Sequence, residues 1–126
     1  MQGSASSPVL TWVLAQDADR LAITAVTVME VADGIARMQP GRRRDQLAAQ
    51  WDMLEGRWLG TFLPMGMQAA RMAGAVSARR RGMGRPMSMA DACLAGVCLA
   101  HEARLATRNT RDFEDIGLTL IDPWAI

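Results

Sequence analysis

Four side chains in this sequence, three acids and one amide, have the chemical types and the positions expected of a metal centre. Glu30 and Asp91 each fall in the first turns of an expected helix, and Asn109 and Asp112 lie in a polar turn after a short apolar stretch. In parallel α/β sheets, helix N-termini and loops meet at the carboxyl ends of the strands, so we expect these groups to share one pocket. Carboxylates there suit Mg²⁺, which lowers the pKa of bound water and orients it for attack on a phosphodiester.

Each acid also has a purely structural interpretation. Thr27 and Glu30 have the spacing of a capping box, in which the glutamate bonds back to the start of its own helix. Asp91 follows Ser88 by three residues, where an acid stabilises a helix N-terminus, and an isolated Asp112 is typical of a turn. Function is therefore indicated only if these side chains lie together.

The positive charge of the chain comes entirely from arginine, since none of its 14 cationic residues is lysine. Thr107, Arg108 and Arg111 border the acidic turn and are candidate substrate-binding residues, because an arginine fork binds phosphate bidentately; solvated loop charges are the alternative. Residues 79–81 with Arg85 indicate either a track for nucleic acid or cations placed favourably at a helix C-terminus.

Length and composition limit the class of protein. The 126 residues, half of them apolar, suit one domain, and the net charge of +1 creates no overall field toward nucleic acid. Cys93 and Cys98 are expected on different faces of one helix, which disfavours a disulfide, and His101 is the single histidine. No apolar run reaches the roughly 20 residues of a membrane span, and residues 1–8 lack signal-peptide features, so we expect a cytoplasmic protein.

Strands alternate with helices along the sequence, and these elements must position the candidate residues. Helices are expected at 9–14, 27–38, 47–58, 68–81 and 88–102. Short strands are expected at 21–25, 61–65, 104–107 and 118–121. This alternation predicts βαβ units, an α/β fold with a parallel sheet between helix layers.

Several of these segments together resemble the PIN-domain ribonucleases, in particular the VapC-type toxins of bacterial toxin–antitoxin pairs. The matching segments, in order, are residues 23–30, 34–35, 89–92, 105–113 and 121–124. The resemblance implies a PIN-like three-layer domain over residues 9–126, after a disordered segment at 1–8. It also implies an endoribonuclease that depends on Mg²⁺ or Mn²⁺, cleaves RNA, forms a homodimer and is neutralised by a cognate antitoxin.

The resemblance assigns roles to the acids. Glu30, Asp91, Asn109 and Asp112 match the catalytic positions, and among them Asp91, Glu30 and Asp112 match metal ligands. Position 109 is often Asp in the family, whereas Asp112 is the acid of the Asn-Thr-Arg-Asp-Phe variant. Both therefore remain alternatives for the fourth site residue.

The start of the chain departs from the family pattern. Family members open with an apolar strand that ends in Asp, a main metal ligand, whereas residues 1–8 hold neither the strand nor the acid. Asp17 and Asp19 precede the strand that leads to Glu30 and do not replace that ligand. By resemblance the absent strand is central in the sheet, so its neighbours would have unpaired backbone groups, which cost about 1–3 kcal/mol each where buried.

Three explanations of this departure stay open: a truncated or late-started product, a natural degenerate copy, and a sheet gap closed by rearrangement or by a partner chain. We expect truncation. The function expected is a metal-dependent endoribonuclease toxin with activity impaired by truncation. The alternative is a non-catalytic, degenerate toxin fold that dimerises and binds antitoxin.

Overall fold

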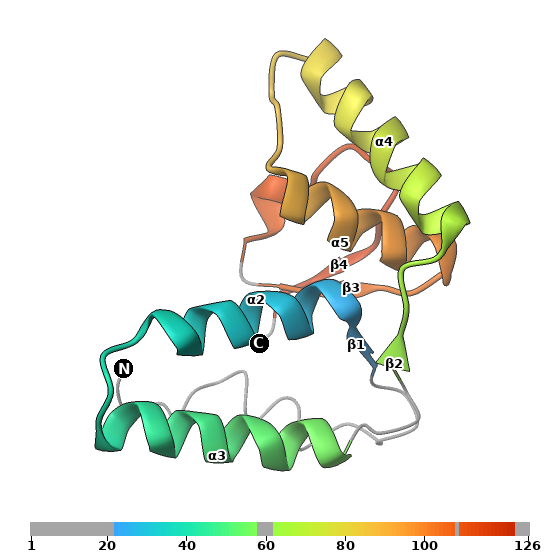
Figure 1. Ribbon diagram of the computed structural model, residues 1–126. Helices are drawn as coiled ribbons and strands as arrows, with labels where there is room; N and C mark the ends of the chain where they lie inside the picture. Colours follow the sequence, from blue (N-terminus) through green and yellow to red (C-terminus); the bar gives the residue numbers. More distant parts are fainter. Residues whose placement is uncertain (1–21, 58–61, 108, 123–126) are drawn as a thin grey trace.

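The computed structural model of the protein describes residues 22–57, 62–107 and 109–122 (Figure 1). The expected N-terminal segment at 1–8 and the expected helix at 9–14 lie outside these residues. Four helices, one 3-10 helix and four short strands are described, in the following order: β1 (Ile23–Thr24), α2 (Ala25–Arg37), α3 (Arg42–Arg57), β2 (Phe62–Leu63), α4 (Met67–Gly82), α5 (Met89–Ala100), β3 (Leu105–Ala106), the 3-10 helix η3 (Thr110–Phe113) and β4 (Leu120–Ile121). The predicted alternation of strands and helices is confirmed.

The strands form two parallel pairs. In the first, Ile23 of β1 lies opposite Phe62 of β2. In the second, Leu105 of β3 lies opposite Leu120 of β4. Within the described residues, no strand bridges the two pairs.

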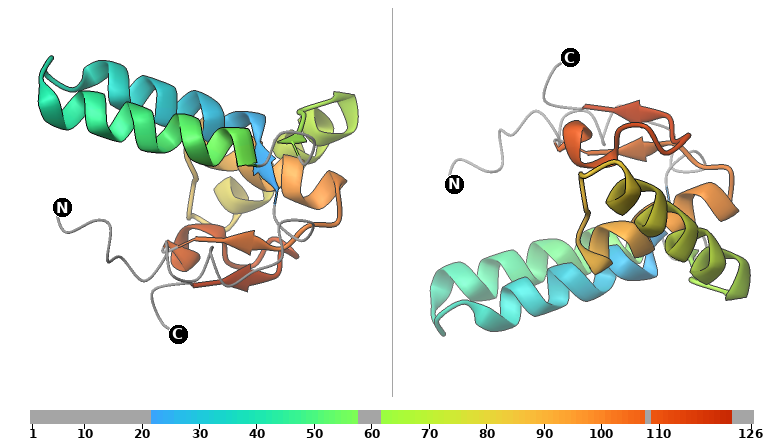
Figure 2. Two further views of the ribbon diagram at one scale, coloured as in Figure 1. Left: turned by 90° about the horizontal axis from the view of Figure 1, so that it is seen from below. Right: turned by 90° about the horizontal axis from the view of Figure 1, so that it is seen from above.

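Helix α5 is the central element of the core. One buried cluster joins it to α4, β3 and η3; its residues are Val76, Ala92, Ala95, Cys98, Leu105, Phe113 and Ile116. A second cluster joins α5 to α2 and α4 through Val26, Ala69 and Val97. Figure 2 shows α4 and α5 packed together over the β3–β4 pair. Because α5 contributes to both clusters, it sets the relative positions of the other elements.

Small residues allow α4 and α5 to approach closely. A Cβ atom added at Gly96 would lie 2.4 Å from the carbonyl oxygen of Ala69 and 2.8 Å from the Cβ of Ala73. Cys98 is buried and Cys93 half-buried, both as free thiols, which confirms that they form no disulfide. Burial raises the pKa of the Cys98 thiol to about 11.

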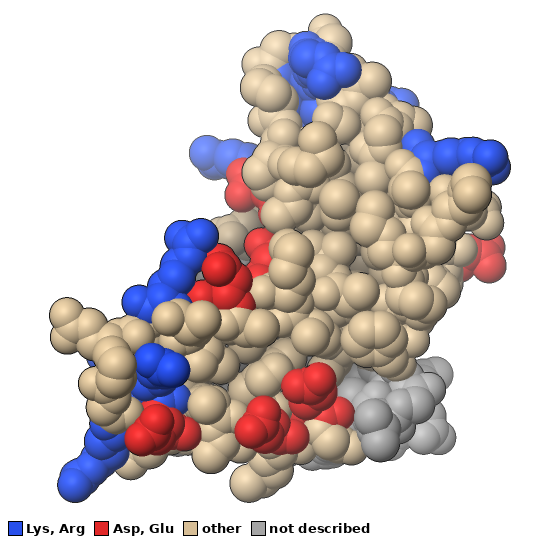
Figure 3. All heavy atoms as spheres, in the orientation of Figure 1, with Lys and Arg blue, Asp and Glu red and all other residues tan. Residues whose placement is uncertain are grey.

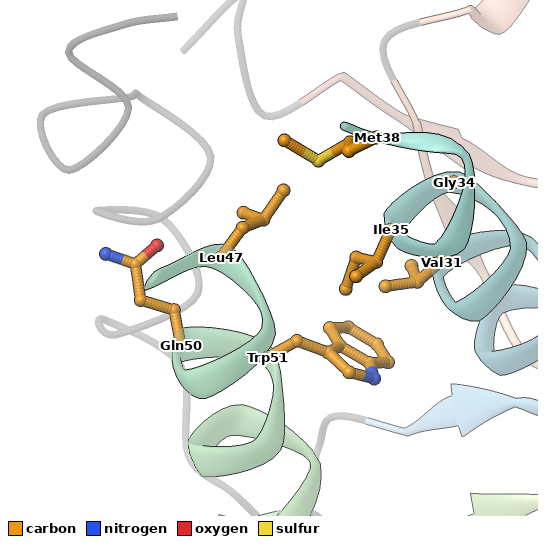
Figure 4. A pocket seen from close by; sticks show the side chains of 7 residues that line it. All are labelled: Val31, Gly34, Ile35, Met38, Leu47, Gln50 and Trp51. Atoms are coloured by element: carbon orange, nitrogen blue, oxygen red, sulfur yellow. The ribbon is translucent and has the colours of Figure 1, made fainter. Parts of the chain in front are cut away.

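Helices α2 and α3 lie side by side and extend from the rest of the molecule (Figure 1, Figure 2). An open apolar cleft of about 500 Å³ lies between them. Figure 4 shows Trp51 of α3 directed toward Val31 and Ile35 of α2. No described residue of α3 is buried, so this helix packs through half-exposed side chains.

The start of α2 differs from the expected one. The helix begins at Ala25, and Thr24 is its N-cap, since the Thr24 hydroxyl accepts a hydrogen bond of 3.0 Å from the backbone N–H of Thr27. The β conformation of Thr24 lets its side chain reach that N–H. Thr27 therefore lies inside the helix, and the capping-box interpretation of Glu30 is wrong.

Across the described part of the chain, none of the helices combines the length and the apolar character that crossing a membrane requires.

Candidate metal centre

Asp91 is held at the start of α5 by a helix cap. Ser88 is the N-cap, as predicted, and its hydroxyl accepts a hydrogen bond of 3.1 Å from the backbone N–H of Asp91. The Asp91 side chain is half-buried. The acid is thus fixed at a helix N-terminus, where the backbone dipoles favour negative charge.

The pKa of Asp91 reports what surrounds its carboxyl. Burial raises that pKa above its ordinary value of 3.8, and the hydrogen bond with the Ser88 side chain lowers it. The negative charge of Asp112 raises the pKa further, whereas the positive charge of Arg80 lowers it. The charges of Asp91 and Asp112 therefore act on each other, and a pocket shared by the two acids stays a prediction.

Asp112 lies in η3, a short helix anchored in the core. Phe113, the next residue, is 3% exposed. The backbone N–H of Asp112 donates to the carbonyl oxygen of Asn109 at 3.0 Å, and the N–H of Asn109 donates to the Thr107 hydroxyl at 3.1 Å. Thr107 thus orders the turn, and the side chains of Asn109 and Asp112 are exposed.

Arg80 is the feature of this region that sequence reasoning missed. Its side chain is 4% exposed and reaches from α4 to three backbone carbonyls. Its Nε donates to the carbonyl oxygen of Arg85 at 2.9 Å, and its Nη1 donates to those of Asp112 at 2.7 Å and Glu114 at 3.4 Å. The signal was present in the sequence, because Ala69, Ala73, Val76 and Arg80 recur at steps of four, three and four and form the buried stripe of α4.

The other arginines of this region divide between ion pairs and free surface. Arg85 pairs with Glu114 at 3.2 Å and with Asp115 at 2.8 Å. Arg79 and Arg81 are exposed in the last turn of α4, where the helix dipole favours cations. The interpretation of residues 79–81 and Arg85 as a uniform basic track is therefore wrong, because Arg80 is buried and Arg85 is paired.

Glu30 lies on α2 and is exposed. It follows Val26 by one turn, and Val26 packs against Val97 of α5. Helices α2 and α5 run in opposite directions in Figure 1. Figure 3 shows acidic side chains between α2 and the region of η3, with arginines beside them.

No group of three or more histidine, cysteine or acidic side chains that could hold a metal ion occurs among the described residues. Of the predicted ligands, Asp91 and Asp112 are the two whose charges act on each other, and Glu30 as a third ligand stays a prediction. Arg111 is exposed in η3, beside Asp112. Arg108 lies outside the described residues.

Comparison with known proteins places this arrangement in context. The PIN domain family matches residues 5–118. The chain is 36% identical over 120 residues to the VapC ribonuclease Y4jK of Sinorhizobium fredii, covering 92% of this chain and 84% of that protein. It is equally identical, over the same shares, to the plasmid stability protein StbB of Pseudomonas syringae pv. tomato.

Solved structures share the fold. The crystal structure of FitAcB from Neisseria gonorrhoeae superposes with a TM-score of 0.84 at 22% identity, over 94% of this chain and 86% of that one. DNA-bound VapBC from Salmonella typhimurium gives 0.77 at 23% identity, over 91% of this chain and 84% of that one. At these identities the likeness concerns the fold.

Proposed function

Since the chain belongs to the PIN-domain family, we propose that it is a metal-dependent endoribonuclease, the toxin of a toxin–antitoxin pair, which hydrolyses RNA phosphodiester bonds. The name of its 36% identical relative, VapC ribonuclease, supports the reaction. The observation that carries the proposal is the pair of acids on neighbouring elements, Asp91 on α5 and Asp112 on η3, whose charges repel each other.

The two acids fit a divalent cation. Burial and the charge of Asp112 both disfavour the ionised form of Asp91, and a cation bound at the pair would offset this cost. Mg²⁺ is commonly held by one or two carboxylates and keeps several waters. We propose Asp91 and Asp112 as ligands of Mg²⁺ or Mn²⁺, with Glu30 as a third and the Asn109 amide as a partner for a metal-bound water.

When bound, the cation would supply Lewis acidity and a water of lowered pKa. The residues of the chain would supply the placement of the substrate. Arg111 is exposed next to Asp112, where its guanidinium fork is suited to a phosphate of RNA. Thr107 and Arg108 are proposed to flank the same phosphate backbone.

Cleavage of RNA by the purified protein tests the proposal. We expect cleavage in Mg²⁺ or Mn²⁺ that stops in EDTA and falls on the order of a hundredfold or more in Asp91→Asn, because metal stabilisation of a transition state is worth several kcal/mol. Asp52→Asn is the matched control, because Asp52 is an exposed acid of α3. Full cleavage in EDTA, or by Asp91→Asn, would contradict the proposal.

A second candidate function is binding of an antitoxin without RNA cleavage. The lack of a group of three potential ligands among the described residues favours it, and the solved VapBC and FitAB relatives suggest an antitoxin as the partner. This function predicts tight binding of the antitoxin, a homodimer, no cleavage and no rise of melting temperature with Mg²⁺. Melting with and without Mg²⁺ therefore separates the two functions.

A further inference from the structure

A buried arginine without a carboxylate partner needs an explanation. Arg80 is 4% exposed, and among the described residues it forms no salt bridge. Burial of a cation is costly unless hydrogen bonds or opposite charge compensate it. Backbone carbonyls supply the hydrogen bonds here, and the field of Arg80 also reaches the Asp91 carboxyl.

The bonds of Arg80 connect rigid elements to the turn that holds Asp112. Arg80 belongs to the buried stripe of α4, and α4 packs tightly on α5 at Gly96. Asp91 stands on that same α5, whereas Asp112 stands on η3. The hydrogen bond of 2.7 Å from Arg80 Nη1 to the carbonyl oxygen of Asp112 links the two acids through the scaffold.

We propose that Arg80 is a positioning residue of the metal centre: it fixes the backbone at Asp112 and so sets the position of that carboxylate relative to Asp91. The inference rests on the proposed function, which makes these two acids the metal ligands. A planar guanidinium can serve three carbonyls in fixed directions, whereas a lysine ammonium lacks this fork. Outer partners that orient metal ligands typically contribute 10–100-fold to metal affinity.

Mn²⁺ affinity tests the inference without any assay of activity. The dissociation constant of Mn²⁺ is measured by electron paramagnetic resonance for wild type, Arg80→Lys and Arg81→Lys, at a temperature where circular dichroism shows each protein fully folded. Arg81→Lys is the matched control, because it is the same substitution at an exposed position of the same helix end. We expect Arg80→Lys to weaken Mn²⁺ binding by about 10–100-fold and Arg81→Lys to leave it unchanged.

The outcomes separate the two proposals. If wild type binds no Mn²⁺, the proposed metal centre is wrong and the inference falls with it. If wild type binds Mn²⁺ and Arg80→Lys binds it equally well, only the inference is overturned, because a purely structural role alters stability and not the affinity of the folded protein. Should Arg80→Lys not fold, NMR of wild type decides. The Arg80 Nη1–H signal, from the group that donates to Asp112, must shift with Mg²⁺ at the same midpoint as the signals of Asp112, and an unmoved signal overturns the inference.

Discussion

Asp91 has a negative charge that its surroundings disfavour. Its pKa lies above 3.8, first because of burial, so the folded protein binds the proton more tightly than the unfolded chain does. The protonated carboxyl therefore contributes stability that is fully present below pH 3.8 and is lost as the pH rises through the raised folded pKa. At neutral pH the ionised acid lowers the free energy of unfolding.

This sign leads to a prediction for Asp91→Asn. At neutral pH the variant should melt at the same temperature as wild type or higher, because it removes a partly buried charge and its repulsion by Asp112. The advantage should shrink as the pH falls through the raised folded pKa of Asp91, and it should be absent below pH 3.8. Thermal melts followed by circular dichroism between pH 3 and 8, without divalent metal, measure the difference in melting temperature between the variant and wild type. A difference that favours the variant less at pH 7 than at pH 3 would contradict the prediction.

At single residues, the sequence predicted part of the site. The Ser88 cap followed from its spacing to Asp91, whereas a metal site at Asp91 and Asp112 stays a prediction. The cap of α2 did not follow from spacing, because Thr24 and Thr27 are both suitable capping residues and only the backbone conformation selects Thr24. The burial of Arg80 was missed because this residue lies in a run of three arginines, and the other two, Arg79 and Arg81, are exposed.

Among the elements, the contact of α4 with α5 depends on a residue without a side chain. A Cβ at Gly96 would lie 2.7 Å from the backbone nitrogen of Ala73 and closer still to the Ala69 carbonyl oxygen. Neither backbone atom can rotate away, unlike the end of a flexible side chain. The two helices would have to separate.

Gly96→Ala should therefore destabilise the protein by about 1–3 kcal/mol, the usual cost of overpacking. Gly74→Ala is the matched control, because Gly74 lies in α4 with open space where the methyl group would go; it should be neutral or raise stability by about 0.5–1 kcal/mol. Urea unfolding measures both free energies. Equal effects of the two substitutions would show that the helices adjust to the methyl group.

The helices were easier to predict than the strands. Apolar spacing gave α4 as 68–81 where Met67–Gly82 is observed, and α5 as 88–102 where Met89–Ala100 is observed. The four strands are two residues long, too short for an alternating pattern to fix their ends. Their pairing into two separate parallel sheets depends on packing against α5, which local sequence does not specify.

For the whole molecule, stability is unevenly distributed. Helices α4 and α5 hold most of the buried residues, whereas the described residues of α3 are all partly or fully exposed. The α2–α3 contact is a cleft open to solvent. Segments with few buried apolar contacts open locally at low free energy.

Hydrogen exchange followed by mass spectrometry should show this difference directly. Amides of α3 should exchange at least about tenfold faster than amides of α5, which corresponds to a difference of about 1.4 kcal/mol in the free energy of opening. The peptides of α4 serve as an internal reference. Equal protection of α3 and α5 would mean that further contacts hold α3 in place.

The hydrogen bond from Arg80 to the backbone of η3 has a consequence for how such a protein can evolve. Arg80 donates its hydrogen bond to the backbone carbonyl oxygen of residue 112 and not to its carboxylate. This bond therefore does not depend on which side chain residue 112 has. Under the proposed function, a mutation at this position would remove a metal ligand while the hydrogen bond from Arg80 to the backbone persists. A descendant could thus keep the fold after a single substitution has removed the proposed reaction.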